Sequence, residues 1–236
     1  LVATHTDILQ NDVLEALTQA ILQRGTDNEV YLPPKLESIG ISAFSGCSKQ
    51  IGKIILLGNL RTISDSAFSN TGIEEVEVQD GIESIGGDAF ASCKKLKRVI
   101  IADSVRTIGR SAFEHCSSLK EITLPASAKY DTYVNSESTT SATFVDVEAE
   151  KIVFTKGTGE VFVPETDEDW YHSNISLPWY SKDSLKEVEF EEGIEEIYAE
   201  ALSGCWKVET IKIPETVKKI GDRAFANCTS WTGDVY

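Results

Sequence analysis

The sequence predicts an α/β solenoid built from short parallel strands, with a helix at its N-terminal end. Two observations support this prediction. A motif with a period of about 23 residues occurs six times, and a short stretch of alternating apolar and polar residues lies between successive motifs. One such unit cannot enclose a core, so the units must stack as coils. Stacking aligns the strands into one parallel sheet and places the motif on the opposite side of each coil, called here the return side.

The motif is Ala-Phe or Ala-Leu followed by two variable residues and Cys. Its aromatic or leucine positions are Phe44, Phe68, Phe90, Phe113, Leu202 and Phe225. Five residues before each stands Ile39, Ile63, Ile85, Ile108, Ile197 or Ile220. The Cys position holds Cys47, Cys93, Cys116, Cys205 and Cys228, with Thr71 in the second copy. We expect one buried column of aromatic side chains, one of Ile side chains, and a ladder of small free thiols.

The stretch between motifs predicts the strands and their two faces. Its apolar residues are spaced as in Leu96, Val99 and Ile101. Because alternate residues of a strand point to opposite faces, the residues flanking the middle apolar position should point outward. They are Lys53, Ile55, Glu75, Glu77, Arg98, Ile100, Glu121, Thr123, Glu187, Glu189, Thr210 and Lys212. The sequence therefore predicts one continuous sheet surface on which Ile55 and Ile100 are apolar exceptions.

Two segments depart from the repeat. Residues 1–29 predict a helix over about 7–23 that caps the first coil, with a linker helix as the alternative. The remaining chain, 30–236, predicts the solenoid, with a divergent segment at 127–184 that lacks the motif. We favour two or three divergent repeats in that segment, with strands at 152–154 and 161–164, over a hairpin insertion or an independent domain.

Composition and charge argue against several kinds of partner. The chain has 236 residues, 41% of them hydrophobic, and a formal net charge of −16. This charge repels phosphate backbones and anionic membrane surfaces, so no nucleic-acid partner is expected. No apolar run approaches the roughly 20 residues of a membrane helix, so no membrane insertion is expected.

The sequence gives no support for catalysis or metal binding. His115 beside Cys116 is the one adjacent His–Cys pair, but Cys116 is expected in the core, whereas a nucleophile must be exposed. The cysteines lack zinc-ligand spacing, and no phosphate-binding or hydrolase motif occurs. We predict a non-enzymatic protein with no catalytic residue, metal or cofactor. The alternative is an enzyme built in the divergent segment around Trp170, Tyr171, His172, Trp179 and Tyr180.

Residues 208–228 carry almost completely the pattern Leu-x-x-Ile-x-Ile-Pro-x-x-Val-x-x-Ile-Gly-x-x-Ala-Phe-x-x-Cys. This pattern resembles the BspA-type leucine-rich repeat, over roughly residues 30–128 and 185–236. The resemblance implies a right-handed leucine-rich-repeat superhelix. It also implies a secreted or cell-surface adhesion protein of the kind typical of bacteria. The chain starts without Met, so we expect that an export signal has been removed.

The resemblance and the predicted sheet surface together suggest the function. We expect a module that binds a protein or a glycan on a host or neighbouring cell. Its tentative binding residues are Lys53, Ile55, Glu75, Glu77, Arg98, Ile100, Glu121 and Thr123, with Trp170, Tyr171, Trp179 and Tyr180 at the margin. The alternative is a structural spacer within a larger cell-surface protein. Clustered apolar or aromatic residues on the outer surface would favour binding, and uniformly polar residues would favour the spacer.

Overall fold

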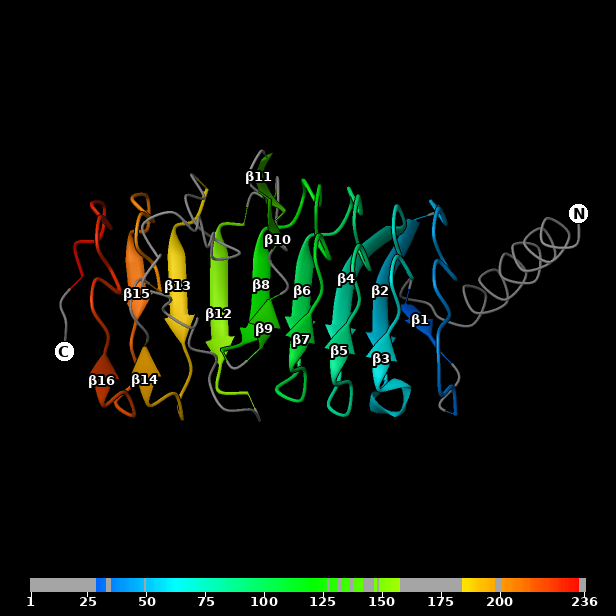
Figure 1. Ribbon diagram of the computed structural model, residues 1–236, viewed down its shortest axis with the longest axis horizontal. Coiled ribbons are helices and arrows are strands. Elements are labelled where there is room, and N and C mark those ends of the chain that lie inside the picture. The colour runs from blue at the N-terminus through cyan, green and yellow to red at the C-terminus, as the bar shows by residue number, and fades with distance from the viewer. Residues whose placement is uncertain are drawn as a thin grey trace, which may run out of the picture.

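Eight parallel strands form one sheet along the molecule (Figure 1). The computed structural model describes residues 29–32, 35–48, 50–126, 128–130, 133–135, 138–141, 147, 149–157, 184–197 and 201–233. In spatial order the strands are β1 (Glu29–Tyr31), β2 (Gln50–Leu56), β4 (Gly72–Val78), β6 (Arg98–Ile101), β8 (Glu121–Pro125), β12 (Lys151–Thr155), β13 (Glu187–Phe190) and β15 (Thr210–Lys212). Every neighbouring pair is parallel, which confirms the predicted solenoid.

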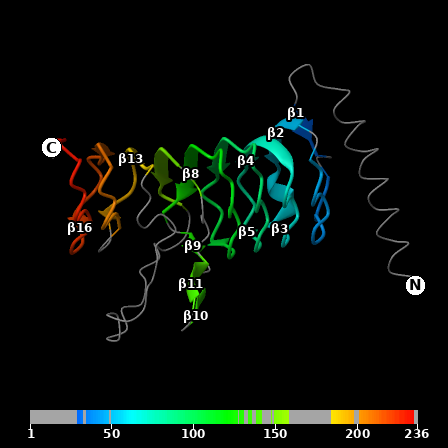
Figure 2. The ribbon, with the colours of Figure 1, turned by 90° about the horizontal axis from the view of Figure 1, so that it is seen from above.

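Short strands line the return side and form the second layer, seen edge-on in Figure 2. A four-stranded sheet contains β3 (Thr62–Ile63), β5 (Ser84–Ile85), β7 (Thr107–Ile108) and β9 (Lys129–Tyr130), and a two-stranded sheet contains β14 (Glu196–Ile197) and β16 (Lys219–Ile220). A 3-10 turn, η1 (Gly58–Leu60), comes directly after β2. The described residues contain no α-helix, so the α/β class is not confirmed. The helix predicted over 7–23 lies outside them.

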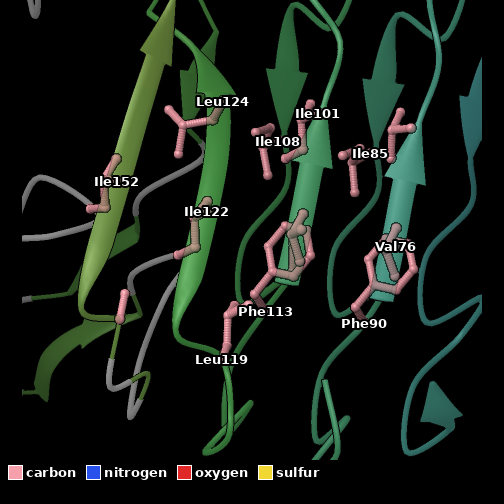
Figure 3. Close-up of a cluster of buried hydrophobic side chains, with 14 of the residues drawn as sticks. Val76, Ile85, Phe90, Ile101, Ile108, Phe113, Leu119, Ile122, Leu124 and Ile152 are labelled. Carbon is pink, nitrogen blue, oxygen red and sulfur yellow. The ribbon is translucent and has the colours of Figure 1, made fainter. Parts of the chain in front are cut away.

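The core lies between the two layers and consists of the predicted columns (Figure 3). The rings of Phe44, Phe68, Phe90 and Phe113 stack with centroid separations of 4.9, 5.4 and 5.2 Å. The first five Ile positions of the second column are buried. Ile220 departs from the prediction, because it lies in the last described coil and is 46% exposed. At this end of the described stack the Ile position therefore loses part of its cover, whereas Ile39 in the first described coil stays buried.

Two positions of the repeated motif adopt the left-handed backbone region wherever the structure describes them. The residue before Ala has φ between 53° and 56° at Ser42, Ser66, Asp88, Ser111 and Arg223. The residue before the Cys position is Gly46, Asn70, Ser92, His115, Gly204 or Asn227, also with positive φ. These turns point alternate amides along the solenoid axis, so the Phe90 amide donates to the Ala112 carbonyl of the next coil at 2.8 Å. Regular hydrogen bonds between coils thus offset the cost of left-handed residues.

The cysteines form the predicted ladder of small buried groups. Cys93, Cys116, Cys205 and Cys228 are buried, Cys47 is half-buried, and all five are free thiols. The Cys116 thiol donates to the Phe90 carbonyl at 3.2 Å, and the Cys228 thiol donates to the Leu202 carbonyl at 3.2 Å. Thr71 occupies a cysteine position and is buried, and its Oγ1 lies 3.1 Å from the Cys93 Sγ of the next coil.

The divergent segment contains both a strand of the main sheet and a hairpin. Strand β12 confirms the strand predicted at 152–154 and places Ile152 opposite Ile122 of β8 and Val188 of β13. An antiparallel hairpin of β10 (Tyr133–Asn135) and β11 (Ser138–Ser141) projects beyond β9, away from the eight-stranded sheet (Figure 2). The strand predicted at 161–164 lies outside the described residues. The division into 1–29 and 30–236 stays a prediction.

Removing one ring from the aromatic column should destabilise the fold according to its position. Phe90→Ala empties a site with a stacked neighbour on each side, and we expect the free energy of unfolding to fall by about 3–5 kcal/mol. Phe44→Ala is the matched control, because Phe44 is half-buried and should cost less. Urea denaturation of both variants measures the difference. An equal loss in both would contradict a column that is buried from both sides.

The thiols should react slowly in the native protein. Burial raises the pKa of the Cys205 thiol to about 12 and raises the pKa of the Cys228 thiol, so little thiolate is present at neutral pH. Labelling with an aromatic disulfide should be slow without denaturant, starting at the half-buried Cys47, and complete in denaturant. Rapid native labelling of most thiols would show that the ladder is accessible.

Candidate functional site

Strand register brings the predicted outward residues onto one surface in two columns. The first column runs Lys53, Glu75, Arg98, Glu121, Lys151, Glu187 and Thr210, and the second runs Ile55, Glu77, Ile100, Thr123, Val153, Glu189 and Lys212. We call these residues the outer sheet face. The sequence prediction missed Lys151 and Val153, because no motif marks the coil of β12. The strand predicted at 152–154 was the available signal, because alternate residues of a strand point to opposite faces.

Charges on the outer sheet face alternate in sign and pair with one another. From Lys53 to Glu187 each basic residue of the first column has an acidic neighbour on the adjacent strand. Lys53 contacts Glu77 at 2.5 Å, and Arg98 contacts Glu121 at 3.3 Å. The Lys53 hydrogen bond lowers the pKa of Glu77. Cross-strand pairing of opposite charges stabilises a sheet modestly.

The outer sheet face is close to neutral although the chain is strongly acidic. Its basic residues are Lys53, Arg98, Lys151 and Lys212, and its acidic residues are Glu75, Glu77, Glu121, Glu187 and Glu189. These four basic and five acidic residues leave a formal charge of −1, against −16 for the whole chain. Most of the negative charge therefore lies elsewhere on the molecule.

Four of these residues form a closed ring of ion pairs across β12, β13 and β15. Lys151 lies 3.2 Å from both Glu187 and Glu189, and Lys212 lies 3.0 and 3.1 Å from the same two carboxylates. Hydrogen bonds from Lys212 and Lys151 lower the pKa of both glutamates. The ring therefore links β13 and β15, which follow the divergent segment in the sequence, to β12 within that segment.

Three uncharged residues interrupt this pattern in the middle of the sheet. Ile100, Thr123 and Val153 are neighbours in the second column, on β6, β8 and β12. Ile100 and Thr123 are half-buried, and Val153 is 8% exposed. We call them the uncharged strip. At each end of the strip lies a carboxylate that is held in an ion pair. These carboxylates are Glu77 on β4 and Glu189 on β13. Ile55 lies in the same column, but Glu77 separates it from the strip.

Four of the predicted binding residues, Trp170, Tyr171, Trp179 and Tyr180, lie outside the described residues, so their place at the margin stays a prediction. The largest exposed apolar side chains in the described part of the chain lie off the outer sheet face, at Ile41 (73%), Ile220 (46%) and Trp206 (44%). Lys207 lies 4.8 Å above the Trp206 ring. The sequence analysis did not select these three residues, because Ile220 was expected in the core and the other two lie outside the repeat columns.

The one candidate nucleophile is in the wrong state for catalysis. Contact with Cys93 and burial raise the pKa of the Cys116 thiol, and His115 instead lies 3.6 Å from Glu114. In the part of the chain that the structure describes, no group of three or more His, Cys, Asp or Glu residues could hold a metal ion. A search of the same residues finds no helix with the length and apolarity to cross a membrane.

Comparison with known sequences identifies the repeat. A profile of the BspA type leucine-rich repeat region matches residues 24–141 and 174–233, in six copies. The chain belongs to this family. Solved structures also resemble it, among them a Treponema pallidum leucine-rich repeat protein at 20% identity, which covers 88% of this chain and 79% of that chain with a TM-score of 0.46. No curated protein matches the sequence.

Two further structures are of longer chains. The pneumococcal vaccine antigen PcpA is 21% identical, with 82% of this chain and 58% of that chain covered and a TM-score of 0.47. A leucine-rich cell surface protein from Faecalibacterium prausnitzii is 21% identical, with 76% and 46% covered and a TM-score of 0.34. This BspA-type chain thus spans about half the length of each.

The ion-pair ring should make stability depend on pH. Because the folded pKa values of Glu187 and Glu189 are lowered, the ring stabilises the fold above their unfolded pKa, and this contribution is lost as pH falls through the folded values. Lys212→Met should cost about 1 kcal/mol or less at pH 7 and reduce the loss of stability between pH 7 and the acid range. The control is Lys94→Met, at an exposed lysine. Chemical denaturation at several pH values tests this, and identical pH profiles for wild type and Lys212→Met would exclude the ring as a source.

Proposed function

We propose that this BspA-type chain is a non-enzymatic binding module, secreted or displayed on a cell surface, that contacts a protein or glycan of a host or neighbouring cell through its outer sheet face. The uncharged strip carries the proposal. It lies at the centre of a surface whose surrounding charges are held in ion pairs. Membership of the family supports a repeat scaffold, and such a scaffold offers an extended surface that can vary without disturbing the core.

The charge arrangement favours an uncharged contact surface on the partner. Ile100 and Val153 provide apolar contact area, and Thr123 between them provides a hydroxyl group. Lysine and glutamate side chains around the strip already neutralise each other, so they give a partner little net attraction. Binding at this surface should therefore depend weakly on ionic strength, unlike binding steered by the charge of the whole chain.

Aromatic residues of the divergent segment extend the proposal. Trp170, Tyr171, Trp179 and Tyr180 would supply the large rigid side chains that dominate interface energetics, and we place them at the margin of the site. Aromatic rings also pack against sugars and apolar protein surfaces through the same flat faces. This part of the proposal rests on the sequence.

A structural spacer is the second candidate, and one observation favours it. Nine of the 14 outer-face residues are charged, and most of these charges take part in cross-strand pairs. A surface of this kind resists non-specific association and holds its shape. A spacer would separate another domain from the cell without binding through the sheet. The same binding measurements distinguish the two candidates.

Substitution in the uncharged strip should weaken binding without unfolding the protein. A glycan array and a panel of host extracellular proteins identify a partner. Ile100→Asp should then raise Kd about tenfold or more, which corresponds to a loss of about 1.4 kcal/mol or more, because it introduces an unpaired carboxylate. Trp179→Ala should act similarly, with the melting temperature nearly unchanged in both variants.

Thr210→Asp is the matched control. Thr210 lies on the outer sheet face but is exposed on β15, which β13 separates from the nearest strand of the strip, β12, so Kd should not change. An unchanged Kd in both Ile100→Asp and Trp179→Ala would show that the binding site lies elsewhere. The return side would then be the next candidate. A folded chain with no partner in either panel would favour the spacer.

A further inference from the structure

A cluster of lysines lies at one edge of the eight-stranded sheet. The turns that join the two layers of the solenoid run along the long edges of the described stack (Figure 1). Lys94, Lys95 and Lys97 lie in the turn between Cys93 and β6, and Lys120 lies directly before β8. All four lysines are exposed. We call them the lysine patch.

The lysine patch places like charges side by side. The Lys120 amide donates to the Lys97 carbonyl at 2.9 Å, so the same position of two neighbouring coils holds two positive charges. Like charges at neighbouring positions of a sheet are destabilising. In the first column of the outer sheet face, by contrast, charges alternate in sign from Lys53 to Glu187. A local departure from a rule that the chain follows elsewhere is expected at a functional site.

The positive charge of the patch is only partly neutralised. Lys94 and Lys95 form no ion pair with the described residues. The other two lysines pair with Glu74 at 2.6 Å and with Glu150 at 3.3 Å, and their side chains are 61% and 45% exposed. An ammonium group has three N–H donors, so a lysine with one carboxylate partner can still donate to a ligand. The patch therefore presents four accessible ammonium groups.

Carboxylates bound the patch in both directions along the stack. The Lys97 amide donates to the Glu74 carbonyl of the preceding coil at 2.7 Å, and the Glu150 amide donates to the Lys120 carbonyl at 2.8 Å. The patch thus spans two coils, whose equivalent positions lie about 5 Å apart. A long polyanion or a membrane surface would extend beyond these carboxylates onto a chain with a formal charge of −16. The ligand that fits is short and densely charged.

The surroundings of the patch argue against a peptide or a nucleic acid. Strands β6 and β8 have a neighbouring strand on each side, so no free edge remains to which an extended peptide could add a strand. Residues 94–97 and 117–120 include no aromatic side chain, so bases have no ring to stack on. Ser117 and Ser118 occupy in the next coil the positions of Lys94 and Lys95. The patch therefore offers ammonium and hydroxyl groups.

We propose that the lysine patch binds a short sulfated saccharide. Sulfate oxygens accept charge-assisted hydrogen bonds from lysine, and the ring hydroxyls of a sugar match the hydroxyl groups beside the patch. Sugar rings hold their sulfates on a stiff frame, so less conformational freedom is lost on binding than with a flexible acidic peptide. The patch lies at the edge of the sheet and not at the uncharged strip, so this inference does not rest on the proposed function.

Calorimetric titration of the full chain with a heparin-derived tetrasaccharide tests the proposal. We expect binding at about 50 mM salt that weakens steeply as salt rises, because lysine contacts release counterions. Lys94→Ser combined with Lys95→Ser gives this turn the two serines of the next coil, so the fold should be retained. This double variant should raise Kd about tenfold or more and make Kd less dependent on salt.

Lys35→Ser combined with Lys218→Ser is the matched control. Both lysines are exposed and lie outside the patch, and the net charge of the chain changes by the same amount. Kd should stay close to the wild-type value. An equal loss of affinity in both double variants would show a response to overall charge and would overturn the proposal. The same tetrasaccharide without its sulfates should not bind the wild type.

Two further results would contradict the proposal. The first is a wild-type chain that does not bind the sulfated tetrasaccharide at low salt. The second is hexaglutamate or a short single-stranded DNA that binds as tightly, because the patch would then select charge alone. A partner bound through the uncharged strip should keep its Kd in Lys94→Ser with Lys95→Ser. Loss of tetrasaccharide binding alone therefore bears on the lysine patch, and loss in Ile100→Asp bears on the proposed function.

Discussion

The fold depends on each coil being completed by its neighbours. No coil encloses an apolar interior of its own, so the Phe90 ring is buried because Phe68 and Phe113 stack on its two faces. The same holds for the backbone, where an amide that points along the axis finds its acceptor one coil away. Stability is therefore a sum of nearest-neighbour interfaces, and the ends of the stack differ chemically from its middle.

The stacking of coils also determines the chemistry of the outer sheet face. Every outward residue lies about 5 Å from its counterparts on adjacent strands, so one side chain can pair with partners in two coils. Glu187 and Glu189 do this, with Lys151 on one neighbouring strand and Lys212 on the other. Paired charges leave apolar residues such as Ile100 as the distinctive chemistry of the outer sheet face.

The sequence predicted the parts of the structure that repeat. Because Ile and Phe hold fixed positions in the motif, their periodicity determined the two core columns and, through strand alternation, the facing of Lys53, Arg98 and Glu121. It could not predict features that lack a counterpart in other coils. Strand β12 carries no motif, and the hairpin of β10 and β11 is a local insertion. Ile220 is exposed because no further described coil packs against its own, and residue type alone does not reveal this. The ion-pair ring also required β12 to be placed beside β13 before its members could be recognised.

The direction of the hydrogen bonds between coils has a mechanical consequence. These bonds lie along the solenoid axis, so a force that pulls the two ends of the stack apart loads one coil interface at a time instead of shearing many bonds together. Coils would then peel away successively from an end, and each unit of about 23 residues would release on the order of 80 Å of extended chain. A tether built in this way lengthens in steps under load, and each released coil can fold back onto the stack when the force is removed.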